Sequence, residues 1–501
     1  MLRRRLLQWA GPSRSSQPWV CRQCLSKRAY SQQAKKAPTP SDQGPPDHRV
    51  LGNKQKLFMN SLYSPGSPIF LPNGTRIFNR LVTFLREQYV RYGFQEVITP
   101  TIYKKSLWEK SGHLQNYADD MYYVSGNEKQ PADGCCGTKK TPEEGDADDG
   151  FGMKPMNCPG HCLVFASELR SYRDLPLRYA DFSPLHRNEI SGALSGLTRV
   201  RRFHQDDGHI FCRPVQVEEE IKKTLDFVKV VYNVLKLSEG YRLELSTRPK
   251  DHYMGTEEEW ERAEGALRRA LDQSGMEWTI NEGDGAFYGP KIDIVIKDSD
   301  GKEHQTATIQ LDFQLPKRFE LEYMAPAPKH EARGETIPED AVTGEYGAVR
   351  PVMIHRAVLG SVERLMALLI EKYNKTWPFW LNPRQVMILT TNTTPNVMEW
   401  AETVRKELVG DNTDVYERLA QGEVFGEDEA VNKPTGLAVD VDGRKTTVGV
   451  KIREASMKGY GEILVIGPRD AENKTVTTSS KETVTKETMR TRLVNKVNSF
   501  Q

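Results

Sequence analysis

Residues 176–212 alternate polar and apolar side chains around a turn rich in Gly and Ser, from Ser191 to Gly196. Because successive side chains of a strand point to opposite faces, the pattern predicts two long antiparallel strands. A single face would then carry a charged and aromatic set: Arg187, Glu189, Arg199, Arg201, Phe203, Gln205, Asp207 and His209. Cationic side chains can bind phosphate, and an aromatic ring beside a carboxylate can bind adenine. A solvated ladder of salt bridges would explain the charges but not the ring or the histidine.

The rest of the chain divides into a core and a smaller second domain. The hydrophobic spacing predicts these elements by residue range: helices 76–92, 218–237 and 361–373 with strands 292–296 and 308–312, then strand 386–390, helix 396–408, strand 447–450 and strand 462–466. The acidic, Gly-rich stretch 125–150 is expected to be a surface loop. Helices and strands segregate in the first part and alternate in the second, which predicts an α+β core followed by an α/β domain.

Composition excludes some classes of protein. The chain has 501 residues, of which 38% are hydrophobic and 28% charged, as in a soluble enzyme. No run approaches the roughly 18 apolar residues of a membrane span. The net charge of +2 remains compatible with nucleic-acid binding, since basic residues can gather on one face.

The N-terminus differs from the rest of the chain. Residues 1–41 contain nine Lys or Arg residues, and no acidic residue precedes Asp42. This composition is typical of a mitochondrial transit peptide, and Arg28 to Ser31 resembles a processing site. A basic tail that contacts RNA is the alternative interpretation. The transit peptide implies a protein of the mitochondrial matrix.

The seven cysteines do not suggest a disulfide framework. Cys21 and Cys24 form an isolated CxxC in the presumed presequence, which is a weak signal. Cys135 and Cys136 fall in the predicted surface loop. The other three are Cys158, discussed below, and two expected to be buried apolar residues, Cys162 and Cys212.

Five motifs in order carry a family resemblance. His186 to Glu189 with Gly196 to Phe211 resembles motif 2 of class II aminoacyl-tRNA synthetases, and His355 to Arg364 resembles motif 3. Pro100 matches the proline of motif 1, the dimer-interface element. Leu107 to His113 and Met156 to His161 are similar to signatures of threonyl-tRNA synthetases.

The resemblance implies a fold and an activity. It predicts an antiparallel class II core flanked by helices at residues 47–382, after a targeting segment and linker at 1–46. A C-terminal α/β anticodon-binding domain would follow at 383–501. The expected reaction is ATP-dependent ligation of L-threonine to tRNA(Thr) through threonyl-adenylate, in mitochondrial translation. The expected assembly is a homodimer.

The resemblance also implies a metal site. It brings Cys158, His209 and His355 together as zinc ligands, although each residue alone is more often structural. Three ligands and an open position are typical of a functional zinc site. Zinc that binds the amino and hydroxyl groups of threonine would leave valine under-coordinated, and a missing hydroxyl at such a site costs on the order of 10⁴-fold.

Other roles follow from the motifs. Arg187 is expected at the α-phosphate, Glu189 at the adenine amino group and Phe203 against the ring. Arg199 and Arg364 would bind the outer phosphates, assisted by Mg²⁺. The remaining expected site residues are His113 for proton transfer from tRNA, Lys291 near carboxylate and phosphate, Gln205, Asp207 and Tyr288 around the threonine ammonium, and Gln305, Thr308, Gln310, Gly360 and Ser361 along the pocket and ATP site.

Departures from the family pattern are also informative. Too few residues precede the core for an editing domain, so measurable activation of serine is expected, since serine retains the hydroxyl group. Residues 411–445 are interpreted as an insertion, and 477–485 lacks the arginines expected for anticodon reading. Two alternatives remain, a prolyl or seryl synthetase and a catalytically inactive RNA-binding relative. Neither accounts for the three metal ligands together with both motif arginines.

Overall fold

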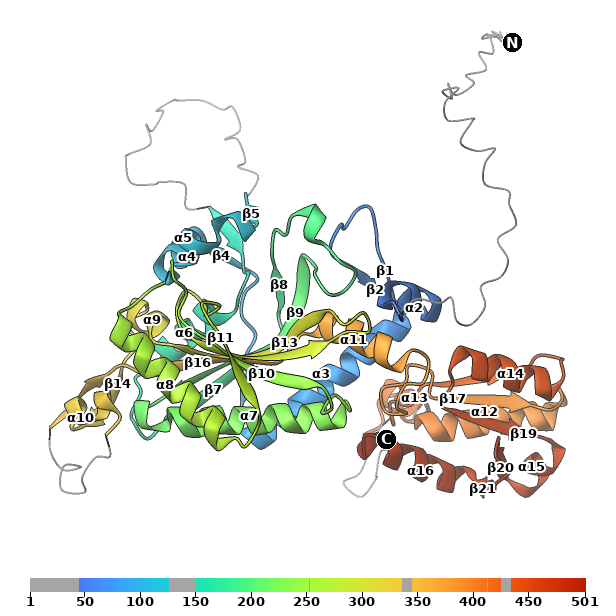
Figure 1. Cartoon of the computed structure of the whole chain (residues 1–501). Coiled ribbons are helices and arrows are strands. Elements are labelled where there is room, and N and C mark those ends of the chain that lie inside the picture. The colour runs from blue at the N-terminus through green and yellow to red at the C-terminus, as the bar shows by residue number, and fades with distance from the viewer. Residues whose placement is uncertain (1–44, 126–149, 252, 336–344, 412, 425–433) are drawn as a thin grey trace, which may run out of the picture. The chain divides into compact units, whose positions relative to one another are not determined.

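The computed structural model describes residues 45–125, 150–251, 253–335, 345–411, 413–424 and 434–501. The described residues from Pro46 onward form one compact unit that contains two main sheets (Figure 1). The presumed presequence, most of the acidic loop and the cysteines Cys21, Cys24, Cys135 and Cys136 lie outside the described residues.

A large, mostly antiparallel sheet forms the core. Its strands follow the order β11, β10, β12, β13, β16, β9, β7, β3, and β8 pairs with β9. Only β10–β11 and β3–β7 are parallel among the described pairs of this sheet. The strands are β3 (Gln95–Glu96), β7 (Leu177–Asp181), β8 (Pro184–His186), β9 (Arg202–Cys212), β10 (Tyr241–Ser246), β11 (Trp278–Asn281), β12 (Lys291–Lys297), β13 (Glu303–Asp312) and β16 (Val352–Ser361). The expected antiparallel class II core is therefore confirmed.

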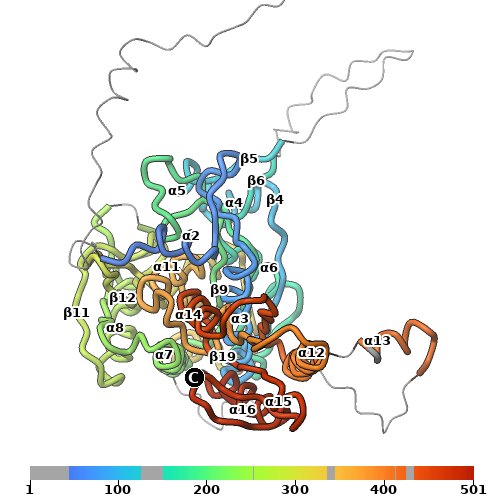
Figure 2. The backbone as a smooth tube through the Cα atoms, turned by 90° about the vertical axis from the view of Figure 1, so that its right-hand side faces the viewer, coloured from blue at the N-terminus to red at the C-terminus, as the bar shows by residue number. Residues whose placement is uncertain are grey.

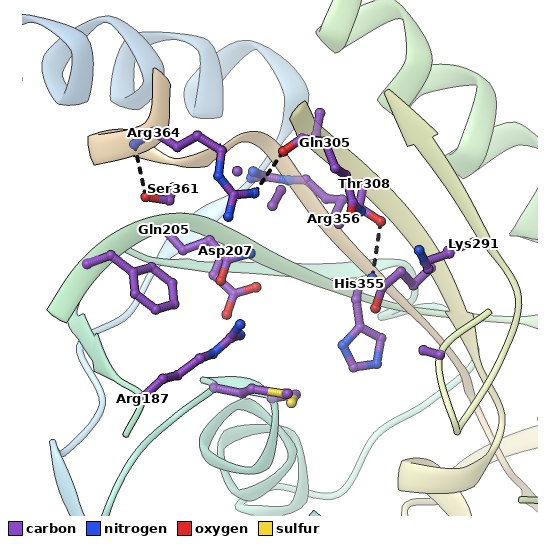
Figure 3. Close-up of a pocket in the computed structure, with 18 of the residues that line it drawn as sticks. Arg187, Gln205, Asp207, Lys291, Gln305, Thr308, His355, Arg356, Ser361 and Arg364 are labelled. Atoms are coloured by element: carbon purple, nitrogen blue, oxygen red, sulfur yellow. Dashed lines mark hydrogen bonds between the residues drawn. The ribbon is translucent and has the colours of Figure 1, made fainter. Parts of the chain in front are cut away.

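Alternation along the strands separates core from site. Ile210 of β9 and Ile354 of β16 belong to the main apolar cluster on one face. Their neighbours His209 and His355 point to the other face, where a cavity lies (Figure 3). The period of two thus gives each central strand an apolar side and a chemical side.

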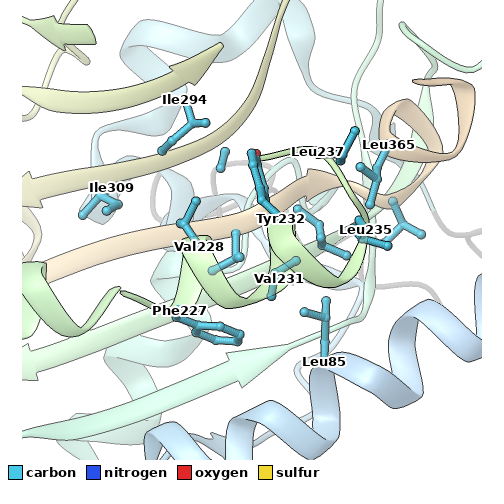
Figure 4. Close-up of a cluster of buried hydrophobic side chains, with 14 of the residues drawn as sticks. Leu85, Phe227, Val228, Val231, Tyr232, Leu235, Leu237, Ile294, Ile309 and Leu365 are labelled. Atoms are coloured by element: carbon cyan, nitrogen blue, oxygen red, sulfur yellow. The ribbon is translucent and has the colours of Figure 1, made fainter. Parts of the chain in front are cut away.

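Helices α3 (Pro72–Tyr92), α7 (Val217–Val234) and α8 (Glu257–Gln273) cover the apolar face. Figure 4 shows Val228 of α7 in one cluster with Leu85 of α3 and with two residues of the sheet, Ile294 and Ile309. The predicted helices are confirmed with shifted ends. Helix α3 begins four residues early because Pro72, whose φ is already helical, occupies its first turn.

Shorter elements surround the cavity face and the edges of the sheet. Helix α2 (His48–Gln55) lies beside α11 (Val362–Tyr373) in both Figures 1 and 2. The others are α4 (Lys105–Ser111), α5 (His113–Tyr117), α6 (Cys158–Ala166), α9 (Gln314–Arg318), α10 (Pro328–Arg333), β1 (Phe58–Met59), β2 (Ile69–Phe70), β4 (Ile102–Lys104), β5 (Tyr123–Val124), β6 (Phe151–Met153), β14 (Tyr323–Pro326) and β15 (Tyr346–Val349).

The second sheet belongs to the C-terminal α/β domain. Parallel strands in the order β18, β17, β19 continue into antiparallel β20 and β21. Ile388 of β17 packs in the cluster of α12, whereas its neighbour Leu389 packs with Ala455 of α14. The elements are β17 (Val386–Thr390), β18 (Val439–Asp442), β19 (Glu462–Ile466), β20 (Thr475–Thr478), β21 (Thr483–Thr485), α12 (Pro395–Val409), α13 (Thr413–Ala420), α14 (Val448–Lys458), α15 (Pro468–Asn473) and α16 (Lys486–Asn498).

One expectation for this domain is wrong. The predicted strand 447–450 is the start of helix α14, for which Thr447 is the N-cap residue. The segment connects β18 to a strand parallel to the same neighbour, and parallel strands require a crossover, usually a helix. The stretch 411–445, interpreted from the sequence as an insertion, contains β18, which pairs with β17 in the sheet.

None of the described helices is both long enough and hydrophobic enough to cross a lipid bilayer.

A buried ion pair lies within the apolar face of the main sheet. Arg356 Nη1 donates to Asp206 Oδ1 at 2.5 Å, and both side chains are fully buried. Asp206 also accepts from the Tyr89 hydroxyl and from the backbone N–H of Val358 at 3.1 Å. The guanidinium carbon lies 4.1 Å from the centroid of the Phe94 ring. The pair therefore ties β9, β16 and α3 together.

Replacing Asp206 by Asn should destabilise the protein strongly. The substitution leaves the Arg356 charge buried and uncompensated, which typically costs about 3–5 kcal/mol. Lys297→Ala, which removes an exposed pair with Glu303 at 3.7 Å, is the control and should cost about 1 kcal/mol or less. Urea denaturation measures both changes, and equal losses of stability would contradict this role of Asp206.

Candidate functional site

A cavity of about 480 Å³ opens on the face of the main sheet opposite α3, α7 and α8. Strands β9, β13 and β16 form its floor. Every site residue expected from the sequence lines it except His113: Cys158, Arg187, Glu189, Arg199, Phe203, Gln205, Asp207, His209, Tyr288, Lys291, Gln305, Thr308, Gln310, His355, Gly360, Ser361 and Arg364.

Cationic side chains gather at one end of the cavity. Figure 3 shows Arg187 and Arg364 on opposite sides of it, with Asp207 between them. Arg364 Nε donates to the carbonyl of Thr198 and Nη1 to that of Gln305, each at 3.0 Å. Burial and the neighbouring cations lower the pKa of Arg364. An anionic ligand here would relieve that repulsion.

The start of α11 depends on a sharp change of backbone direction. Gly360 has a φ of +58°, and a Cβ at this position would lie 2.6 Å from the carbonyl oxygen of Thr306. Only glycine fits both constraints. Ser361 then caps the helix by accepting from the backbone N–H of Arg364 at 3.2 Å. The change of direction at Gly360 and the cap at Ser361 thereby aim Arg364 into the cavity.

Each group expected to bind adenine contacts an arginine that is expected to bind phosphate. The Glu189 carboxylate pairs with Arg199 at 2.8 Å. The Arg187 guanidinium lies 5.0 Å from the centroid of the Phe203 ring. A nucleotide that uses these four groups must replace both contacts with its own.

One expectation about this face is wrong. Arg201 does not line the cavity, and its Nε donates to the backbone carbonyl of Glu189 at 2.9 Å. The predicted alternation fails here because Ser195 and Arg199 close a tight turn, so that β9 begins only at Arg202.

A carboxylate organises the polar wall formed by β12 and β13. Asp293 binds the ammonium of Lys291 at 2.5 Å and accepts from Thr308 at 3.1 Å and from Gln305. Although burial disfavours the charge of Lys291, Asp293 and Asp284 raise its pKa. Lys291 therefore remains a cation at neutral pH. Sequence reasoning missed Asp293, although it lies two residues after Lys291 on the same face of β12.

Three metal-ligand side chains meet at the other end of the cavity. One ligand atom of each of Cys158, His209 and His355 lies within 4.8 Å of the others, and all three residues are buried. His209 Nε2 and His355 Nδ1 are 3.0 Å apart. Burial raises the pKa of the Cys158 thiol and lowers that of His209, so a cation is needed to hold the thiolate that metals bind.

Two further residues fix the orientation of these histidines. Asp312 Oδ2 lies 2.8 Å from His355 Nε2, which directs the other nitrogen of this ring toward His209. His161 Nδ1 lies 2.7 Å from His209 Nδ1. Carboxylate and polar partners of this kind commonly orient metal-binding histidines. Alternation along the strand could have indicated Asp312, which follows Gln310 by two residues. Helical spacing could have indicated His161, which lies three residues after Cys158.

An aromatic ring completes this end of the cavity. Tyr288 stacks on His355, with ring centroids 5.0 Å apart and planes at 24°. Its hydroxyl donates to the side-chain carbonyl of Gln310. Tyr288 and Gln310 thus present polar atoms beside the metal-ligand cluster.

His113 lies behind the cluster instead of lining the cavity. Its Nε2 is 3.8 Å from Cys158 Sγ, and its Nδ1 is 2.8 Å from the Ser111 hydroxyl. Burial, followed by the charge of His355, lowers the pKa of His113 to about 3. The ring is therefore neutral and able to accept a proton only if it gains access to the cavity.

Comparison with family models gives the class of protein. Residues 141–373 match the tRNA synthetase class II core domain (G, H, P, S and T), and residues 385–498 match an anticodon-binding domain. The antiparallel sheet, the cavity with Arg187 and Arg364, and these matches define a class II aminoacyl-tRNA synthetase.

Individual relatives narrow the family. The chain is 48% identical over 435 residues to the probable mitochondrial threonine–tRNA ligase of Schizosaccharomyces pombe, covering 87% of this chain and 84% of that one. It is 42% identical to the mitochondrial threonine–tRNA ligase of Saccharomyces cerevisiae, covering 91% of each. The chain therefore belongs to the threonyl-tRNA synthetase family. It spans 52% of a probable cytoplasmic relative from Dictyostelium discoideum.

Solved structures agree with this assignment. A crystal structure described as the RNA binding domain of threonyl-tRNA synthetase from Cryptosporidium parvum matches with a TM-score of 0.72 and 40% identity, covering 90% of this chain and 98% of that one. A prolyl-tRNA synthetase from Giardia lamblia matches at 16% identity with a TM-score of 0.57, which is a likeness of fold alone.

Proposed function

We propose that this protein joins L-threonine to tRNA(Thr) with ATP, through a threonyl-adenylate, in the mitochondrial matrix. The observation that carries the proposal is the presence of Cys158, His209 and His355 in the same cavity as Arg187 and Arg364. One end of this cavity suits an amino acid bound to a metal, and the other suits the phosphates of ATP.

We assign zinc to the three metal-ligand residues. Two imidazoles and a thiolate match the preference of zinc for nitrogen and sulfur, and three ligands leave a position for substrate. Zinc bound there would act as a Lewis acid that recognises the amino and hydroxyl groups of threonine. Tyr288 stacks on His355 and Asp207 Oδ1 lies 3.7 Å from His209 Nε2, and these two residues with Gln205 of the same cavity would bind the ammonium. Selection against valine would follow from its missing hydroxyl group.

Zinc content should depend on Cys158 and not on its buried neighbour Cys162. Wild-type protein should retain about one zinc per chain, and Cys158→Ala should lower its zinc affinity at least about 10-fold by removing a ligand. Cys162→Ala is the matched control, because its sulfur lies against Met353 instead of in the cluster. Mass spectrometry of the metal after dialysis measures the content. Full zinc retention by Cys158→Ala would remove Cys158 from the site.

Adenylation requires the cationic end of the cavity. A carboxylate oxygen of threonine attacks the α-phosphorus of ATP, and pyrophosphate leaves. Arg187 would neutralise charge at the α-phosphate, while Arg199, Arg364 and Mg²⁺ would bind the outgoing phosphates. Glu189 would turn from Arg199 to the adenine amino group, and Phe203 from Arg187 to the adenine ring.

Arg364→Lys should impair threonine-dependent charging of tRNA(Thr). Lysine keeps the charge but not the planar group that reaches both Thr198 and Gln305, so kcat/KM should fall about 100-fold. Arg333→Lys, at an exposed position of α10, is the control and should leave charging unchanged. Equal activity of both variants would contradict the role of Arg364. Absence of threonine charging by the wild type would contradict the proposed function itself.

Transfer to tRNA needs a proton acceptor. The terminal ribose hydroxyl attacks the carbonyl carbon of threonyl-adenylate, and AMP leaves while the hydroxyl proton passes to a base. A neutral imidazole suits this task, and His113 is neutral at physiological pH. We propose that its ring moves from beside Cys158 into the cavity when tRNA binds.

His113→Asn should separate the two steps. Transfer to tRNA should slow by about 10²-fold, the usual scale of a lost general base, while threonine-dependent ATP–pyrophosphate exchange should change little. Single-turnover transfer from preformed adenylate measures the first rate. An equal loss of exchange would indicate that His113 supports the Cys158 end of the site instead of the transfer step.

Location and assembly complete the proposal. Residues 1–46, most of which lie outside the described part of the chain, would direct import into the matrix, and mitochondrial relatives support that location. A homodimer is proposed through the motif 1 region around Pro100. Ile98 there is 89% exposed and Val90 84% exposed, so a second copy would cover apolar surface.

A further inference from the structure

His48, in the first turn of α2, connects two elements that flank the ATP end of the cavity. It is 5% exposed. Its Nε2 accepts from the backbone N–H of Leu197 at 3.1 Å, and its Nδ1 lies 2.7 Å from Glu371 Oε1. Because a backbone amide only donates, Nε2 must be the acceptor, and the proton of the neutral ring is on Nδ1, facing the carboxylate.

Glu371 is itself held in place. Its Oε1 also accepts from the backbone N–H of His48 at 3.2 Å. Its Oε2 lies 3.0 Å from the hydroxyl of Ser299, whose single proton it shares with the nearer carbonyl of Pro46 at 2.7 Å. The imidazole therefore has a fixed orientation toward Leu197.

The return loop, Ser195–Arg199, is attached to α11 at two successive residues. Glu371 reaches Leu197 through His48, and Arg364 donates directly to the carbonyl of Thr198 at 3.0 Å. Residues 364 and 371 are seven positions apart and share one side of the helix. One helix thus holds the N–H of Leu197 and the carbonyl of the next residue.

The turn before this attachment leaves no space for a side chain. Gly196 has a φ of +49°, and a Cβ there would lie 2.1 Å from His48 Nε2. Any other residue would displace the ring that accepts from Leu197. The tight turn at Gly196 and the position of the His48 ring therefore depend on each other.

The return loop carries part of the ATP end of the site. Thr198 and Arg199 line the cavity, and Arg199 pairs with Glu189. The groups expected to bind threonine, such as Gln205 and Asp207, lie on β9 and are fixed by the sheet instead. Displacement of the loop should therefore disturb ATP more than threonine.

We propose that His48, held by Glu371, is a positioning residue that fixes the return loop for ATP binding. This inference rests on the proposed function, and it extends the site to a helix outside the motifs that identify the class. Asp47, His48 and Glu371 could in principle hold a metal ion. However, both nitrogens of His48 already have partners, and Asp47 binds the Arg49 side chain at 2.8 Å. The geometry therefore favours positioning.

The test compares His48→Ala and His48→Gln with Asn53→Ala in the full-length protein. The Gln side chain can place an oxygen near the position of Nε2, so it should retain the bond from Leu197. Asn53 is exposed on the same helix and binds only the carbonyl of Arg49 among its described side-chain contacts. Threonine-dependent ATP–pyrophosphate exchange gives KM for ATP and for threonine.

Loss of the acceptor leaves a buried amide unpaired, so KM for ATP should rise about tenfold in His48→Ala. In His48→Gln it should rise by roughly threefold or less, and in Asn53→Ala not at all. KM for threonine should change less than about twofold in each variant. Hydrogen exchange at the Leu197 amide should accelerate about tenfold in His48→Ala.

Either of two results would overturn the proposal. One is unchanged KM for ATP together with unchanged exchange at Leu197. The other is a parallel rise of both KM values with a lowered melting temperature, which would indicate a structural role alone. Wild-type protein without threonine-dependent exchange would contradict the proposed function, whereas the hydrogen-exchange comparison would still decide whether His48 holds the loop.

Discussion

The antiparallel register between β9 and β16 sets His209 directly opposite His355, and the next strand sets Gln310 opposite His355. Three polar side chains thus form a row across the floor of the cavity. If one of these strands slipped by one residue, its polar side chain would turn into the apolar core, because the side-chain period of a strand is two. A slip of β16 would also bring Ile354 into the cavity. The metal-ligand cluster therefore exists only in this register.

The opposite face of the same strands penalises a slip. Ile210, Ile309 and Ile354 are buried against the helices there, each with 1% exposure or less. Among them lie Arg356 and Asp206, which form a buried pair that requires both strands to be in place. An ion pair of this kind adds little net stability but can specify one arrangement over its alternatives. We infer that it does so here, beneath the site it serves.

The sequence predicted best what depends on local pattern. The strands 386–390 and 462–466 were predicted with the bounds that the structure has, because uninterrupted apolar runs mark buried strands. The segment 447–450 was predicted wrongly because Thr and Val favour strands locally, whereas the crossover to β19 requires a helix. Such a requirement comes from the topology of the sheet, which a local pattern does not contain.

Prediction of the functional site was limited in the same way, because local patterns do not contain the fold. Family motifs indicated the residues that line the cavity, and Figure 3 shows many of them together. They did not include Asp293, Asp312 or His48, and they included His161 without a role, although these residues hold the lining residues or their neighbours in place. Two of these contacts join segments distant in the sequence, 43 residues apart for Asp312 and His355 and 149 for His48 and Leu197. Local patterns can mark such residues as candidates, but they cannot show which partner each one meets before the fold is known.

The central claim is that the row on β9, β13 and β16 forms a metal-centred pocket for threonine. The most direct measurement is ATP–pyrophosphate exchange by the zinc-loaded full-length protein with threonine, valine and proline in turn. The account predicts exchange with threonine, and at least about 10³-fold lower kcat/KM with valine, because the pocket reads the hydroxyl group. Comparable exchange with valine or proline would contradict it.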